Sequence, residues 1–92
     1  MREGWLVKVR IPTPLRSYTG NQANVVADGD TLADVLGDLD RRYPGMRFRI
    51  VDEQEQLRQH VSIFIGGERC RDLSTRLDDV DEVVIMQALS GG

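Results

Sequence analysis

Alternating apolar and polar residues predict strands near the start of the chain. Residues 5–11 carry an apolar side chain at every second position: Trp5, Val7, Val9 and Ile11. This period of two is typical of a strand with one buried face. Pro12 and Pro14 end the strand because proline donates no hydrogen bond to a ladder. A turn over residues 18–21 and a returning strand over residues 22–27 complete a predicted hairpin.

A different spacing predicts one long helix after the hairpin. The apolar residues follow at i, i+3, i+4, i+7 and i+11: Leu32, Val35, Leu36, Leu39 and Tyr43. Such a stripe is typical of an amphipathic helix that covers a core. Asp30 or Thr31 is expected to cap its first amides, and Pro44-Gly45 ends it.

The second half of the chain predicts three more strands. Residues 46–59 are irregular, with apolar side chains that need cover (Met46, Phe48, Ile50 and Val51) and an exposed polar loop over residues 52–56. Strands are expected over residues 60–65, 68–70 and 82–88, the first two joined by a tight turn at Gly66-Gly67. Pairing the first and last strands at the centre, with the helix over one sheet face, gives an α+β two-layer domain.

Length and composition narrow the class of protein. The chain has 92 residues, which suits a single domain, predicted over residues 1–88 with a flexible tail over residues 89–92. No apolar run approaches the ~20 residues of a membrane helix, and the first residues lack the apolar core of a signal peptide. One cysteine permits neither an internal disulfide nor a multi-cysteine zinc site. We therefore expect a cytoplasmic protein that is a monomer when free.

The charges argue against nucleic acid as a partner. Fifteen acidic residues outnumber twelve Lys and Arg, for a net charge of −3, whereas a protein that tracks phosphates is usually basic. The charges are nevertheless segregated into basic and acidic runs, which suits either solvated faces or the steering of a charged protein partner.

Few residues suggest catalysis or metal binding. His60 and Cys70 are each the only residue of their type, and no familiar catalytic motif surrounds them. We interpret His60 as a strand-end residue, and Cys70 lacks the second thiol or placed histidine that nucleophilic catalysis needs. Asp28, Asp30 and Asp34 resemble a cation site, but helix capping accounts for two of them. We expect no metal site and no bound cofactor.

The C-terminal residues carry the clearest chemical signal. The sequence closes on Leu89-Ser90-Gly91-Gly92, directly after an apolar strand. Glycines lack Cβ atoms, so this backbone is thin enough to enter a narrow channel. The Gly92 carboxylate is then the least hindered acyl group of the protein, and a tail of this kind is suited to carboxylate activation.

Several segments resemble a known family. They are Val9-Arg10-Ile11-Pro12-Thr13-Pro14-Leu15-Arg16, Tyr18-Thr19-Gly20-Asn21-Gln22, Gly29-Asp30-Thr31-Leu32, Arg42-Tyr43-Pro44-Gly45 and Ala88-Leu89-Ser90-Gly91-Gly92. Together with the element order, they resemble the ubiquitin-like prokaryotic sulfur carriers of the MoaD/ThiS family, most closely the CysO-type carriers of cysteine biosynthesis. The resemblance covers nearly the whole chain. It implies a β-grasp fold, with a mixed sheet packed on one main helix and a protruding C-terminal tail.

The resemblance also implies a mechanism. An E1-like enzyme of the MoeB, ThiF or MoeZ type would adenylate Gly92 with ATP, and a sulfurtransferase or sulfide source would convert the adenylate into a thiocarboxylate. A client, such as a pyridoxal-phosphate cysteine synthase, would take the sulfur; a JAMM-type metallopeptidase is a further possible partner. Residues 89–92 would enter partner active sites, and the carrier would be a protein substrate rather than an enzyme.

Partner docking is predicted on the sheet face that points away from the helix. If Val61, Ile63 and Ile65 face the helix, Phe64 faces away, and the same alternation turns Val84 and Met86 outward. These three residues would form an exposed apolar patch, unless residues 46–59 fold over them.

Three other functions stay open at this stage. The chain could be the small subunit of molybdopterin synthase, or a ubiquitin-like binding module whose tail is never activated. An enzyme that uses Cys70 and His60 is the third.

Overall fold

The fold is built around a five-stranded mixed sheet with α1 packed on one face. The structure is a computed structural model that describes residues 6–88. Its elements are β1 (Leu6–Arg10), the 3-10 helix η1 (Thr13–Thr19), β2 (Asn24–Asp28), α1 (Leu32–Arg42), α2 (Met46–Ile50), β3 (Val61–Ile65), β4 (Glu68–Cys70) and β5 (Glu82–Gln87). No helix within residues 6–88 has the length and apolar character that crossing a membrane requires.

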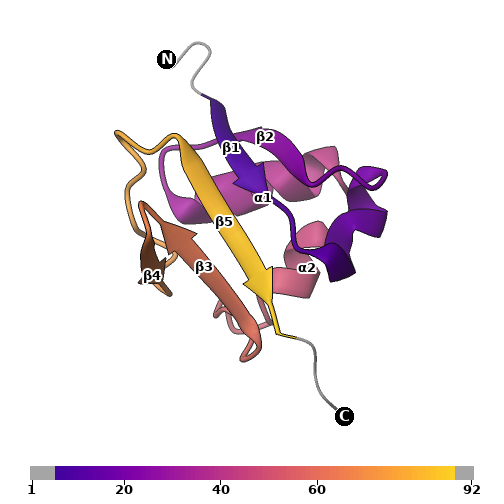
Figure 1. Cartoon of the computed structure of the whole chain (residues 1–92). Helices are drawn as coiled ribbons and strands as arrows, with labels where there is room; N and C mark the ends of the chain where they lie inside the picture. The colour runs from indigo at the N-terminus through magenta and orange to yellow at the C-terminus, as the bar shows by residue number, and fades with distance from the viewer. Residues whose placement is uncertain (1–5, 89–92) are drawn as a thin grey trace.

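The strands lie in the order β2-β1-β5-β3-β4 (Figure 1). β1 and β5 run parallel at the centre, and the other neighbours are antiparallel. The predicted hairpin and the central pairing of the first and last strands are therefore confirmed. Only β2 and β4 lie at the edges of the sheet.

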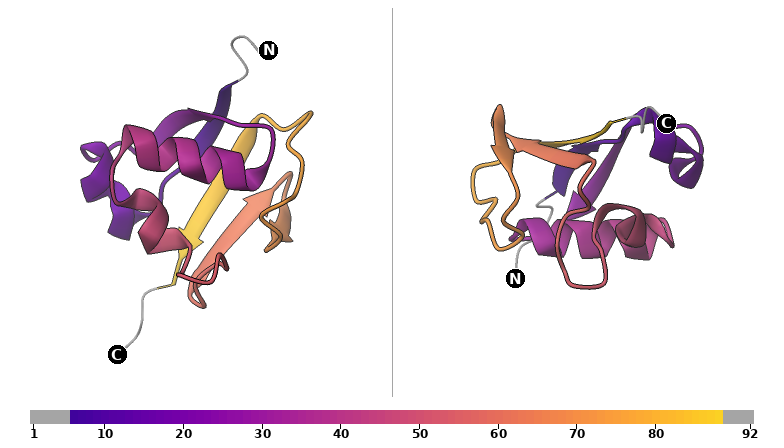
Figure 2. Two further views of the ribbon diagram at one scale, coloured as in Figure 1. Left: turned by 180° about the vertical axis from the view of Figure 1, so that it is seen from behind. Right: turned by 90° about the horizontal axis from the view of Figure 1, so that it is seen from below.

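The helices α1 and α2 lie on the same side of the sheet (Figure 2). The inward residues of the strands meet the apolar stripe of α1 in a core that contains Val7, Val9, Val25, Ala27, Val61, Ile63, Val83 and Ile85 with Leu32, Val35, Leu36 and Leu39. The capping residue of α1 is Thr31. Its hydroxyl accepts the Asp34 amide at 3.2 Å, while the Asp34 carboxylate accepts the Thr31 amide at 3.3 Å. This reciprocal pair is a capping box.

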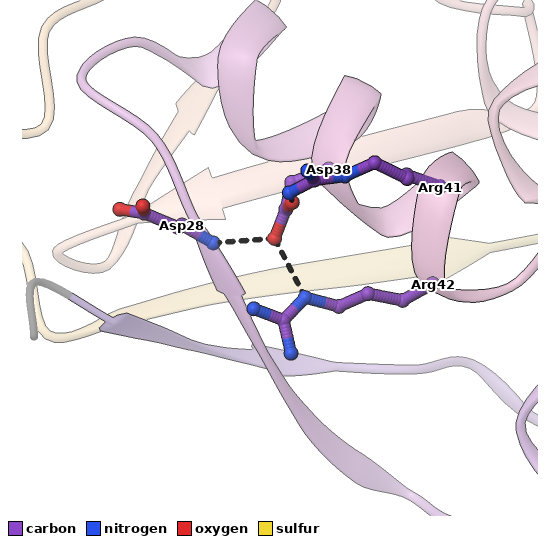
Figure 3. A network of polar contacts seen from close by, with 4 residues as sticks. All are labelled: Asp28, Asp38, Arg41 and Arg42. Carbon is purple, nitrogen blue, oxygen red and sulfur yellow. Dashed lines mark hydrogen bonds and ion pairs between the residues drawn. The ribbon is translucent and has the colours of Figure 1, made fainter.

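A buried carboxylate ties α1 to β2. Asp38 is 7% exposed, and its Oδ2 accepts the Asp28 amide at 2.8 Å and the Arg42 Nε at 2.7 Å. The Arg41 guanidinium donates to its other oxygen, Oδ1. Figure 3 shows Arg41 and Arg42 reaching Asp38 from the same helix. Burial raises the pKa of Asp38, but the Asp28 amide and the two guanidinium groups outweigh burial and lower it from 3.8 to about 2.

Two short helices were not predicted. The 3-10 helix η1 follows Pro12, begins with a proline in its first turn and buries Leu15. It ends at Gly20 and Asn21, both in the left-handed region with φ of 64° and 67°, so the turn expected there is present. The helix α2 occupies the start of the irregular stretch and buries Met46 and Ile50.

The expectation that Phe48 needs cover is wrong. Met46 and Ile50 are four residues apart and share the inner face of α2, so Phe48, midway between them, points outward. Its side chain is 58% exposed. The other three residues of that set are buried, and the loop over residues 52–56 is largely exposed, as predicted.

Residues 6–88 form a single sheet-and-helix unit. Residues 89–92 and Trp5 lie outside the described residues, so the predicted boundary at residue 88 and the flexible tail stay predictions.

Candidate functional site

The strand that leads to the C-terminal residues is held by a neighbouring strand on each side. β5 is hydrogen-bonded to β1 on one side and β3 on the other, and its inward residues Val83 and Ile85 are buried. Beyond the strand, the Ala88 amide donates to the carbonyl of His60 at 2.9 Å. The backbone is therefore fixed up to the last described residue. Leu89, Ser90, Gly91 and Gly92 lie outside the described residues, and their role stays a prediction.

Phe64, Val84 and Met86 lie together on the sheet face opposite α1, and we call them the sheet patch. Phe64 and Val84 are direct cross-strand partners, and Met86 follows Val84 on the same side of β5. Met86 is 54% exposed, whereas the other two are half-buried. Residues 46–59 do not cover them, because that segment packs through Met46 and Ile50 into the core on the helix side. Partner binding by the sheet patch stays a prediction.

Two grooves flank the sheet patch along β5. The first lies at the start of the strand and is lined by Phe64, Gly66, Gly67, Asp79, Val80, Asp81, Glu82, Val84 and Met86. The second lies at its end and is lined by Arg10, Ile11, Pro12, Thr13, Pro14, Arg16, Val84, Ile85, Met86 and Gln87. Val84 and Met86 line both grooves, so these two residues of the sheet patch form the floor that the grooves share, whereas Phe64 lines the first groove alone.

The two grooves differ in charge. The first carries three carboxylates (Asp79, Asp81 and Glu82), and the second carries two guanidinium groups, from Arg10 and Arg16. Arg16 is held in place because its Nε donates to the Ile11 carbonyl at 3.0 Å. A surface with an apolar floor, an acidic end and a basic end would favour one orientation of a charged partner over the reverse one.

The wall of the second groove was missed in the sequence. Pro12 precedes η1 and residues 13–16 form its start, whereas the sequence pattern predicts only the end of a strand at the prolines. Pro14 in the first turn, with Leu15 four residues after the apolar Ile11, was the signal that favoured a helical turn there.

His60 and Cys70 do not form a catalytic pair among the described contacts. The Cys70 Sγ lies 3.1 Å from the Thr75 hydroxyl and 3.5 Å from the Asp72 carbonyl oxygen. His60 precedes β3 and is exposed. Within residues 6–88, no three His, Cys, Asp or Glu side chains are grouped as metal ligands are.

The geometry thus defines a ubiquitin-like β-grasp protein: a mixed sheet, one main helix, and a central last strand that leads to the C-terminal glycines. Comparison with known proteins agrees. Residues 9–92 match the ThiS family. The Mycobacterium tuberculosis sulfur carrier protein CysO is 41% identical over 91 residues, which cover 94% of this chain and 98% of CysO.

Solved structures of similar proteins have the same fold. CysO in the Amycolatopsis orientalis BexX/CysO complex superposes with a TM-score of 0.84 at 32% identity, over 94% of this chain and 99% of that one. The crystal structure of Mycobacterium tuberculosis CysO gives a TM-score of 0.83 at 40% identity, over 90% and 99%. The chain therefore belongs to the ThiS family and is a sulfur carrier protein, not an enzyme. The predicted β-grasp fold is confirmed.

Proposed function

We propose that this protein carries sulfur as a thiocarboxylate on Gly92 and delivers it to cysteine synthesis or a related pathway. The observation that carries the proposal is the 41% identity to the sulfur carrier CysO over 94% of the chain. The match to the ThiS family also extends through residue 92 and so includes both terminal glycines.

The chemistry needs two steps on the Gly92 carboxylate. An E1-like adenylating enzyme joins this carboxylate to the AMP portion of ATP and releases pyrophosphate, which gives the acyl group a good leaving group. A sulfide or persulfide sulfur, supplied directly or by a sulfurtransferase, then attacks the carbonyl carbon and displaces AMP. Attack by sulfide gives the thiocarboxylate directly; a persulfide adduct also needs a reducing thiol to cleave its S–S bond.

The client takes the sulfur from this thiocarboxylate. A cysteine synthase that forms its product from an activated serine is the proposed client. CysO of Amycolatopsis orientalis forms a complex with BexX, which supports a direct complex between this carrier and an enzyme that uses its sulfur. A JAMM-type metallopeptidase would release a product left attached to Gly92. Because activation consumes ATP, we place this chemistry in the cytoplasm.

Intact mass after incubation with ATP, an E1-like enzyme and sulfide tests the proposal. Exchange of oxygen for sulfur adds about 16 Da, and fragmentation should place it on the last residue. A variant that lacks Gly92 keeps the fold and should gain no mass. If several E1-like enzymes all leave the wild-type mass unchanged, the proposal is wrong and a binding module whose tail is never activated takes its place.

The sheet patch supports docking of the activating enzyme. Met86→Asp places a charge on the apolar floor, and because Met86 is 54% exposed the domain should stay folded. We expect the carrier's KM in the activation reaction to rise about tenfold. Val26→Asp is the matched control, because Val26 is 41% exposed on the same sheet face but lies on the edge strand β2. If both variants raise the KM equally, the sheet patch is not part of the docking surface.

A further inference from the structure

A third groove lies on the helix side of the sheet, next to the end of β5. It is lined by Phe48, Arg49, Arg58, His60 and Gln87, and we call it the basic groove. Figure 1 shows α2, which carries Phe48 and Arg49, beside the carboxyl end of β5. None of these residues takes part in the ion pairs that stabilise the fold within residues 6–88, and none belongs to the sheet patch.

The arginines of the basic groove are available to an external anion. Arg49 is exposed, and neither Arg49 nor Arg58 has a carboxylate partner within residues 6–88. Four other arginines in the described part of the chain are paired with acids (Arg41, Arg42, Arg47 and Arg76), whereas Arg10, Arg16, Arg69 and Arg71 have no carboxylate partner within residues 6–88 either. The chain has more acidic than basic residues, so a shortage of carboxylates does not explain why these two arginines are unpaired.

The groove contains an exposed aromatic ring, Phe48, which is in contact with Arg58. The Arg58 guanidinium carbon lies 4.7 Å from the centre of the Phe48 ring, and the Arg58 Nε donates to the Phe48 carbonyl at 2.8 Å. These two contacts orient Arg58 while Phe48 stays 58% exposed. The groove therefore presents a fixed cation against an exposed apolar surface.

Gln87, which also lines the groove, has a side-chain oxygen without a hydrogen-bond donor among residues 6–88. This oxygen, Oε1, is buried. A buried amide oxygen without a donor is unfavourable, and because it is buried, an N–H group of a ligand reaches it only if the Gln87 side chain turns toward the groove. A backbone segment with acidic side chains has both the N–H group for Gln87 and the carboxylates for the arginines.

The basic groove adjoins the point where the chain leaves the sheet. The His60 carbonyl accepts the Ala88 amide at 2.9 Å, and Gln87 lines the groove one residue earlier. A protein that holds residues 89–92 therefore has part of its surface opposite the groove.

We propose that the basic groove docks an acidic segment of the protein that receives the tail. Carboxylates of that segment bind Arg49 and Arg58 as charge-assisted hydrogen bonds, and an apolar neighbour packs on Phe48. This inference rests on the proposed function, because it takes the partner to be one that acts on residues 89–92. The basic groove would give the partner a second contact, in addition to the sheet patch and on the opposite side of β5.

The test compares Arg49→Glu with Arg76→Glu. Each changes the net charge from −3 to −5, since one positive charge becomes negative. Arg76 is exposed, and its pair with Asp78 is exposed on both sides, so loss of the pair costs little. Because a carboxylate at this position is repelled by Asp30, Asp34 and Asp78, circular dichroism first checks that Arg76→Glu is folded. With the activating enzyme, Arg49→Glu should raise the carrier's KM about tenfold and leave kcat within about twofold, whereas Arg76→Glu should match the wild type.

A titration without enzyme tests docking at the basic groove independently of the proposed sulfur-carrier function. Hexaglutamate added to 15N-labelled protein should shift the amide signals of residues 48–50, 58–60 and 87–88 in wild type and Arg76→Glu, and not in Arg49→Glu. If the wild type is active and Arg49→Glu and Arg76→Glu have equal KM values, the proposal that the basic groove docks a partner is wrong. It is also wrong if hexaglutamate causes no saturable change in the amide chemical shifts. A wild type that gains no sulfur but still binds the peptide would overturn the proposed function alone.

Discussion

Replacing Asp38 with asparagine should measurably weaken the packing of α1 on the sheet. The substitution keeps the size of the side chain but removes its charge, so an amide nitrogen faces a guanidinium group where an anion had been. Asp38 is 7% exposed, and three donors converge on it from Asp28, Arg41 and Arg42. The variant therefore leaves donors in the buried network without an anionic acceptor.

The magnitude follows from the pKa of Asp38. A fall from 3.8 to about 2 corresponds to roughly 2 kcal/mol of stabilisation at pH 7. The Arg41 side chain is 77% exposed and that of Arg42 is 39% exposed, so water screens part of this interaction. We expect Asp38→Asn to lower the free energy of unfolding by about 1–2 kcal/mol at pH 7.

The pH dependence separates charge from packing. Because the folded-state pKa lies below the unfolded value, the stabilisation is fully present above about pH 5 and is lost as the pH falls toward 2. About half of it should remain at pH 3. Urea unfolding of wild type and Asp38→Asn at pH 7 and pH 3, followed by circular dichroism, measures the difference at each pH.

Asp79→Asn is the control because Asp79 is exposed and its side chain has no partner in the described part of the chain; its stability should match the wild type at both pH values. A difference between wild type and Asp38→Asn that stays constant from pH 7 to pH 3 would refute the electrostatic reasoning. It would show that the asparagine disturbs packing alone.

Four further substitutions, at three positions in α1 and in the loop before it, are tested by thermal unfolding. Gly37→Ala should raise the unfolding free energy by about 1 kcal/mol, because Gly37 lies inside the helix and an added Cβ meets nothing within 4 Å; an unchanged Tm would contradict this. Gly29→Ala should lower it by about 1–3 kcal/mol, because the new Cβ would lie 2.6 Å from the Val35 amide nitrogen; a stable variant would show that the loop adjusts freely. Thr31→Ala should cost about 1 kcal/mol through loss of the capping box, while Thr31→Ser should keep most of it; equal losses in both variants would exclude the cap as the cause.

Elements with a long regular pattern were predictable because local periodicity and tertiary burial agree in them. The stripe of α1 and the alternation in β1 report directly which side faces the core, and the structure buries those positions. The central position of β5 was predictable for a related reason. Apolar residues on both of its faces are typical of a strand with neighbours on each side.

The short helices were not predictable in the same way. A helix of five residues, such as α2, has too few hydrogen bonds to be stable alone, so tertiary packing decides whether it forms. Met46 and Ile50 fit a helical spacing, but the apolar Phe48 between them also fits a buried strand. Only the packed structure shows that Phe48 points outward, and with it the basic groove that Phe48 and Arg58 form.

The position of β5 limits how any partner can use the tail. Four residues beyond Ala88 reach at most about 13 Å when extended, and the hydrogen bonds on both sides of β5 fix the point from which that reach begins. Under the proposed function, a partner therefore brings its reacting atoms within this radius of Ala88 while it contacts the surfaces around the end of β5. The sheet patch lies on one side of the strand and the basic groove on the other. A partner that contacts both would be restrained in rotation about the strand, which contact with the sheet patch alone would not achieve.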